Sequence, residues 1–145
     1  MATLAADKPI QRQISPIDVV DVLTASAAFY RGAVLVFDTG GSAGTVKGHA
    51  AETAGFAGIA LDAAAAAGDQ VRVLRQGPIV TPLAVQVDEG DEQTIAYCPA
   101  NSTNPADANK TSTSNLAIGK IAIVKTQGAS GANSVVLLVK SAGYA

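Results

Sequence analysis

The sequence predicts an all-β protein, an antiparallel β-sandwich or small β-barrel with an extended N-terminal arm. Short β-branched and apolar runs recur between glycine- and asparagine-rich turns, about every 8–12 residues. No long segment has the apolar periodicity of an amphipathic helix. The chain has three Phe, three Tyr and no Trp, so small and β-branched side chains are expected to fill the core.

Residues 1–16 are expected to form the arm. Leu4, Ile10 and Ile14 stand among polar residues, and Pro9 and Pro16 oppose regular structure. Two interpretations stay open, a disordered terminus and a tether that becomes ordered on a partner. The remaining residues, 17–145, suit a single β domain.

The first elements of the domain are expected to be strands. Pro16 and Asp18 resemble a helix start, but four of the seven residues in 17–23 are β-branched, which favours a strand. Residues 29–37 predict a strand with a bulge or a close backbone approach at Gly32. A turn over 38–44 and a short strand over 45–50 follow.

Residues 56–80 predict the central hairpin. An apolar run at 59–61 leads into five alanines, Gly68-Asp69 reverses the chain, and a β-branched strand follows until Gly77-Pro78 closes the unit. A weaker echo lies at 116–143. The domain is therefore interpreted as two related β units, about 29–82 and 83–145.

The second half is expected to continue as strands and turns. Residues 83–88 alternate between apolar and polar side chains, and a turn over 88–91 is expected to pair them with a return strand at 94–98. A polar loop of seventeen residues, 99–115, is unusually long for a compact domain. The strand at 135–139 is apolar on both faces, so it lies either in the centre of a sandwich or under a neighbouring subunit.

Composition restricts the function classes. Ten basic and twelve acidic side chains give a net charge of −2, without the basic patch of a nucleic-acid-binding protein. The N-terminus lacks the apolar run of a signal peptide, and no stretch resembles a membrane span. We therefore expect synthesis in the cytoplasm, no membrane and no direct nucleic-acid partner. A single cysteine, Cys98, excludes an intramolecular disulfide.

One motif resembles a catalytic loop. Asp38-Thr39-Gly40 after two apolar residues is similar to the active-site loop of aspartic proteases, which need two carboxylates that share a proton. A dimer would have to supply the second, and the expected flap is missing. The favoured interpretation is a β-turn capped by Asp38.

The remaining candidates predict no catalytic, cofactor or metal site. The only histidine, His49, is expected at the surface, and Cys98 is expected to be a small buried residue. The glycines at 40–44 lack the motif of a phosphate loop. Arg72 and Arg75 belong either to a solvated strand face or to contacts with carboxylates of a partner.

Two stretches together carry a family resemblance. AAFYRGAVLVFDTGG and FAGIALDAAAAAGDQVRVLRQGPIV, within residues 17–82, are similar to the capsid decoration or cement proteins of tailed bacteriophages. The resembling features are the glycine in an early strand, the G-I-A-L-D segment, the alanine-glycine turn and the V-R-V strand that ends in G-P-I. The arm and the loop 99–115 depart from the shorter members.

The resemblance implies a structural, non-enzymatic head-stabilising protein on the outer surface of the virion capsid. Its partners would be the major capsid protein and neighbouring copies, as a homotrimer. Another virion component, such as a tail-tube or fibre subunit, is the alternative, and a dimeric aspartic protease is a remote one. The candidate capsid or inter-subunit contacts are Leu4, Ile10, Ile14, Arg72, Arg75, Val136 and Leu138.

Overall fold

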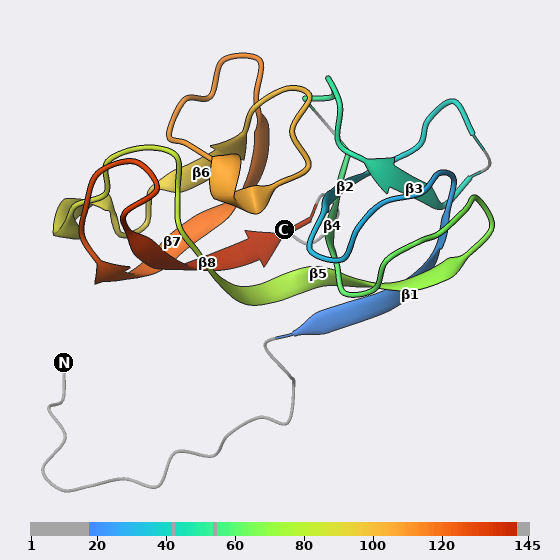
Figure 1. Ribbon diagram of the computed structural model, residues 1–145, viewed down its shortest axis with the longest axis horizontal. Coiled ribbons are helices and arrows are strands. Elements are labelled where there is room, and N and C mark those ends of the chain that lie inside the picture. The colour runs from blue at the N-terminus through green and yellow to red at the C-terminus, as the bar shows by residue number, and fades with distance from the viewer. Residues whose placement is uncertain (1–17, 42, 54, 142–145) are drawn as a thin grey trace, which may run out of the picture.

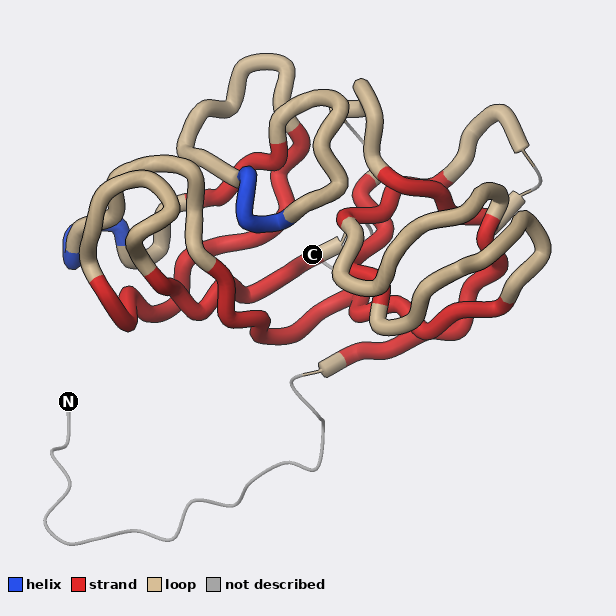
Figure 2. The backbone as a smooth tube through the Cα atoms, viewed as in Figure 1, coloured by secondary structure: helices blue, strands red, loops and turns tan. Residues whose placement is uncertain are grey.

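The computed structural model describes residues 18–41, 43–53 and 55–141. The protein is all-β, as predicted (Figure 1). The strands are β1 (Val19–Ala25), β2 (Val34–Phe37), β3 (Thr45–Gly48), β4 (Phe56–Ala60), β5 (Gln70–Thr81), β6 (Ile95–Cys98), β7 (Leu116–Thr126) and β8 (Ser134–Lys140). Within the described residues, the helical segments are two 3-10 turns, Glu89–Asp91 and Pro105–Asp107 (Figure 2).

The strands form a barrel with a sheet extension. Their order is β1-β3-β2-β4-β5-β8-β7-β6, and β1 also pairs with β5, which closes the first five strands into a barrel. Strands β1 and β3 run parallel, whereas the other named pairs are antiparallel. The predicted small barrel is thus present, and β8, β7 and β6 continue the sheet from the second half of β5.

Strand β5 belongs to both halves of the molecule (Figure 1). Gly77 and Pro78 were expected to end the central hairpin, but β5 continues through them and pairs Gly77 with Val139. Gly77 has φ 151°, and a Cβ there would lie 2.6 Å from an Asp18 carboxylate oxygen. A glycine is therefore needed where β5 leaves β1 and takes β8 as its partner.

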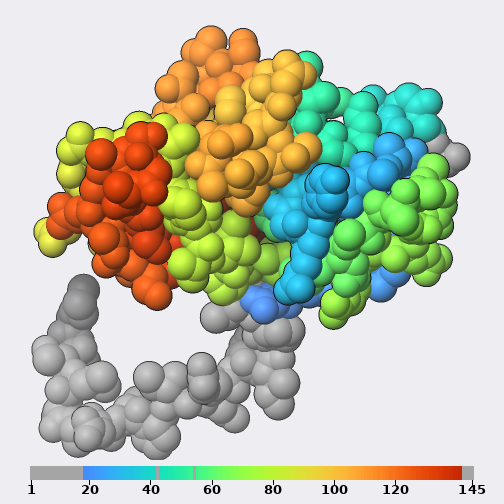
Figure 3. Space-filling model, viewed as in Figure 1, coloured from blue at the N-terminus to red at the C-terminus, as the bar shows by residue number. Residues whose placement is uncertain are grey.

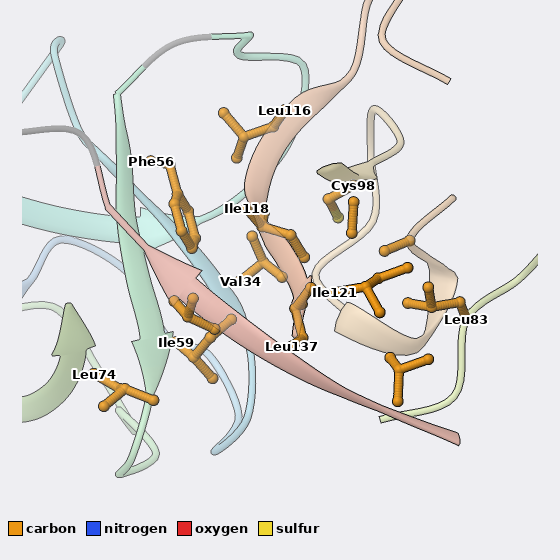
Figure 4. Close-up of a cluster of buried hydrophobic side chains, with 14 of the residues drawn as sticks. Val34, Phe56, Ile59, Leu74, Leu83, Cys98, Leu116, Ile118, Ile121 and Leu137 are labelled. Carbon is orange, nitrogen blue, oxygen red and sulfur yellow. The ribbon is translucent and has the colours of Figure 1, made fainter. Parts of the chain in front are cut away.

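Two hydrophobic cores follow from this arrangement. Side chains from all five barrel strands fill the barrel core, whose buried members are Ala25, Phe29, Ala33, Leu35, Val46, Ala57, Ala60, Ala64, Val71 and Val73. The second core lies between the outside of the barrel and the inner face of β6, β7 and β8 (Figure 4). Strands β2 and β4 are the wall between the cores, which explains why all five residues of β4 are buried.

The strand expected over 29–37 is shorter in the structure. Only Val34–Phe37 forms β2, and Phe29 makes an isolated bridge with Ala64. Gly32 lies in a turn with φ 87°, and its N–H donates to the carbonyl of Ala60 at 2.8 Å. A turn at this glycine, rather than a bulge, separates the bridge from the strand.

The strand expected over 83–88 is absent, although its pattern of burial is correct. Leu83 and Val87 are fully buried, but the backbone lacks a neighbouring strand over most of this segment. The Asn133 side chain accepts a hydrogen bond from Leu83 N at 2.8 Å and donates to the carbonyls of Leu83 and Val85 at 3.2 and 2.9 Å. One buried amide thus takes the place of a strand partner.

Strand β6 therefore pairs with β7 instead of with residues 83–88. The loop 99–115 is bonded to both halves of the molecule, since Thr103 O accepts from Val34 N at 2.8 Å and Ala108 O accepts from Ala84 N at 2.9 Å. In Figure 3 its amber and orange atoms lie over the junction between the barrel and the extension.

Candidate interaction surfaces

The sheet of β5, β8, β7 and β6 has an apolar side turned away from the second core, called here the outer face. Cross-strand register places Leu138 of β8 beside Pro78 and Lys120, and Lys120 beside Ile95 of the edge strand. A second row joins Val80, Val136 and Ile123. The second row is apolar across β5, β8 and β7, whereas Lys120 separates Leu138 from Ile95 in the first row.

A bulge in β7 brings Ile123 to this face. In a regular strand Ile121 and Ile123 would point the same way, but the pairing passes from Ile121↔Leu137 to Ile123↔Val136 and skips Ala122. Ile121 is therefore fully buried in the second core, whereas Ile123 is 53% exposed. The bulge converts a core position into a surface position.

The outer face has a hollow beside Leu138. The hollow has a volume of about 460 Å³, and Leu138, Ile95, Ala117 and Ala122 supply apolar lining. Its charged lining side chains, among the described residues, are Lys120 and Lys140. The surface is suited to an apolar group accompanied by negative charge.

The predicted contact residues fall into three groups. Val136 and Leu138 both lie on the outer face, and Leu138 is 40% exposed. Strand β8 is central in its sheet, and its other apolar set, Val135, Leu137 and Val139, faces the second core. The arm residues Leu4, Ile10 and Ile14 lie outside the described residues.

The two arginines make ion pairs within the chain. Exposed Arg72 binds Asp62 through Nε and Nη2 at 2.9 and 2.8 Å, and this pairing lowers the pKa of Asp62 to about 2. Arg75 is only 9% exposed and lies 3.0 Å from Asp21. Intrachain carboxylates thus occupy both guanidinium groups, and their contact with a partner stays a prediction.

Asp38 caps its own turn, as the sequence predicted. Its carboxylate accepts a hydrogen bond from Gly40 N at 3.1 Å. The Ser26 hydroxyl is the main cause that lowers the pKa of Asp38, and Gly40, Gly41 and Lys47 lower it further. The Asp38 carboxylate is therefore bonded by its own turn and by Ser26 after β1.

His49 is buried, contrary to the expected surface position, with 3% of its surface exposed. Its ring nitrogens Nδ1 and Nε2 each lie 2.9 Å from a carbonyl oxygen, those of Ser102 and Glu52. A carbonyl can only accept, so the imidazolium donates to both and the neutral ring to one. The ring joins the loop after β3 to the loop 99–115.

Cys98 is fully buried in the second core, as predicted. Burial is the main cause that raises the pKa of its thiol to about 11, and a hydrogen bond with the Ser102 side chain offsets this only in part. The thiol also donates to the Ser102 carbonyl at 3.4 Å. A neutral, enclosed thiol is a poor nucleophile. Within the described residues, no cluster of His, Cys, Asp and Glu has the makings of a metal site.

Models of known protein families give no match to this chain, and a search of curated protein sequences gives no significant relative. A search of the described residues for membrane-crossing helices finds none of sufficient length and apolarity. Sequence reasoning identified Val136 and Leu138 but missed Val80, Ile95 and Ile123. The signal for the first two is that β8 is apolar on both faces. The pairing of β5 with β8 places Val80, and the register and bulge of β7 place Ile95 and Ile123.

Proposed function

We propose that this protein is a cement protein of a tailed-phage virion, which binds the outside of the capsid shell and stabilises contacts between major capsid subunits. The observation that carries the proposal is the apolar outer face. Val80 and Ile123 on this face are 62% and 53% exposed. Contiguous exposed apolar residues are typical of protein interaction sites, so the face supports a role in binding another protein.

The capsid as partner rests on the sequence resemblance within residues 17–82. The two stretches that carry it form β2, β4 and most of β5, which are walls of the barrel. The barrel would thus be the scaffold, and the outer face and the arm 1–16 the binding elements. Many copies on one shell, as homotrimers, would make modest contacts strong through multivalency.

The direct test adds the purified full-length protein to expanded capsid shells prepared without it. We expect the protein to remain with the shells on sedimentation and to form protrusions on their outer surface in electron micrographs. Failure to bind, together with recovery of the chain in tails or fibres of purified virions, would replace the proposal with a tail-tube or fibre subunit.

Deletion of residues 2–16 tests the arm separately. The truncated protein is expected to keep its circular dichroism spectrum and unfolding midpoint but to occupy fewer sites on the shell. Unchanged occupancy would exclude the arm from binding. Peptide cleavage by the wild type that Asp38→Asn abolishes would instead establish the protease.

A further inference from the structure

The charged groups at the hollow of the outer face have one sign. Lys120 and Lys140 are exposed and line the hollow. Lys120 lies between Leu138 and Ile95 in the cross-strand row, so it has an apolar neighbour on each adjacent strand. The polar side chains that also line the hollow, Gln76 and Gln93, are neutral.

These two lysines are not used within the described part of the chain. The ion pairs found there use four other cations, Lys47, Arg72, Arg75 and Lys110. By contrast, Lys110, which follows the bridge of Asn109 to β6, forms an ion pair with Asp91 at 3.0 Å. Lys120 and Lys140 therefore remain available to an anion from outside.

Charge also argues against two possible ligands of the hollow that belong to this chain, a second copy and the arm. A second copy packed face to face would bring Lys120 and Lys140 toward the same lysines of the first, and like charges across an interface are unfavourable. The arm carries Lys8 and Arg12 against Asp7, so it too has a net positive charge. A different protein that is negatively charged complements the hollow.

We infer that the hollow binds an extended segment of a partner protein in which an apolar side chain is flanked by carboxylates. The apolar side chain would rest on Leu138 and Ile95, and the carboxylates would meet Lys120 and Lys140. This inference rests on the proposed function for the partner's identity, an acidic and apolar segment of the shell's major protein. The chemistry of recognition stands on the hollow itself.

Charge reversal in the full-length protein tests the inference on shells. Lys120→Glu and Lys140→Glu are each expected to lower the affinity about tenfold near physiological salt, and the loss should shrink at high salt. Lys125→Glu is the matched control, because Lys125 is exposed on β7, the strand of Lys120, but does not line the hollow. It should change affinity less than about twofold. Equal effects of the three variants would overturn the inference while leaving shell binding, and so the proposed function, intact.

A peptide titration tests the same site without shells. Acetyl-Glu-Leu-Glu-Leu-Glu-amide is expected to shift the NMR amide signals of Ile95, Lys120 and Leu138, and Leu138→Ser should abolish the shifts. The matching lysine-leucine peptide should not bind. Binding of both peptides or of neither would overturn the inference.

Sedimentation of the wild type and of Leu138→Ser tests whether a second copy of this chain occupies the hollow. The inference predicts that Leu138→Ser leaves the oligomeric state unchanged. An oligomer that this variant dissociates would assign the face to a second copy and overturn the inference. Binding of the acidic peptide with no binding to shells would contradict the proposed function alone.

Discussion

The barrel core and the second core share the wall of β2 and β4 but are filled by different side chains. Among the described residues, five of the ten buried members of the barrel core are alanines, whereas only two of the sixteen in the second core are. The interior of a barrel narrows with the number of strands, and in this five-stranded barrel alanines fill the space beside Phe29, Leu35 and three valines. The second core, formed where a sheet folds over the barrel, holds Leu and Ile instead (Figure 4).

The two cores also differ in how their surroundings are bonded. The barrel closes through strand pairing, with β1 bound to both β3 and β5. The second core is bordered by loops. Buried side chains such as Asn133 and His49 make hydrogen bonds to the backbone of these loops. We therefore expect added volume to destabilise the barrel core. The second core should instead lose stability when side-chain volume or one of a few polar side chains is removed.

The largest effect is expected from loss of volume in the second core. Leu137 is completely buried in this core. Leu137→Ala should therefore lower the free energy of unfolding by about 2–5 kcal/mol. Urea denaturation measures the change. A loss below about 1 kcal/mol would show that the core collapses around the cavity.

The opposite change is expected to be costly in the barrel. Ala57 is fully buried among barrel side chains, so Ala57→Val should overpack the core and lower the free energy of unfolding by about 1–3 kcal/mol. A stabilised Ala57→Val protein in the same urea experiment would mean that the barrel has unfilled space and would remove the contrast between the cores.

Loss of the Asn133 side chain should release the segment 83–87. Asn133→Ala leaves Leu83 N and three carbonyls without this partner, those of Leu83, Val85 and Ala129. Unfolding is expected to become easier by about 1–3 kcal/mol, with faster amide hydrogen exchange at Leu83. Asn115→Ala is the control, because Asn115 donates one bond within the loop 99–115. Similar losses from both variants would contradict the special role of Asn133.

The smallest effect concerns pH. The Lys47 ammonium is the main cause that lowers the pKa of Glu52 to about 2, at a distance of 2.9 Å. The ionised form is favoured by folding, so its contribution is complete above the ordinary value of 4.5 and is lost as pH falls toward about 2. Glu52→Gln should therefore flatten the decline of stability with acid over this window. A decline as steep as that of the exposed Glu89→Gln control would contradict the assignment.

Local patterns predict the barrel better than the extension. The hairpin of β4 and β5 follows from alternation and a Gly68-Asp69 turn, all within 56–80. The segment 83–87 shows the limit, because its side chains alternate correctly while its backbone is bonded by Asn133, which is about fifty residues away. Similarly, the bulge that exposes Ile123 exists only in the pairing of β7 with β8. Register and long-range polar contacts are not contained in local periodicity.

The exposed apolar surface of the barrel around Val22 is a control for binding through the outer face. Val22 of β1 is 62% exposed on the barrel and pairs with Arg72, eight positions along β5 from Val80 on the outer face. Eight strand positions correspond to roughly 26 Å. The two surfaces can therefore be told apart by where the protein meets its partner.

A cryo-electron microscopy map of shells decorated with the full-length protein tests the central claim most directly. The account predicts that the outer face, with Leu138 and Lys120, is buried against the shell while Val22 faces solvent. A map in which the barrel surface around Val22 meets the shell and Leu138 remains open to solvent would contradict it.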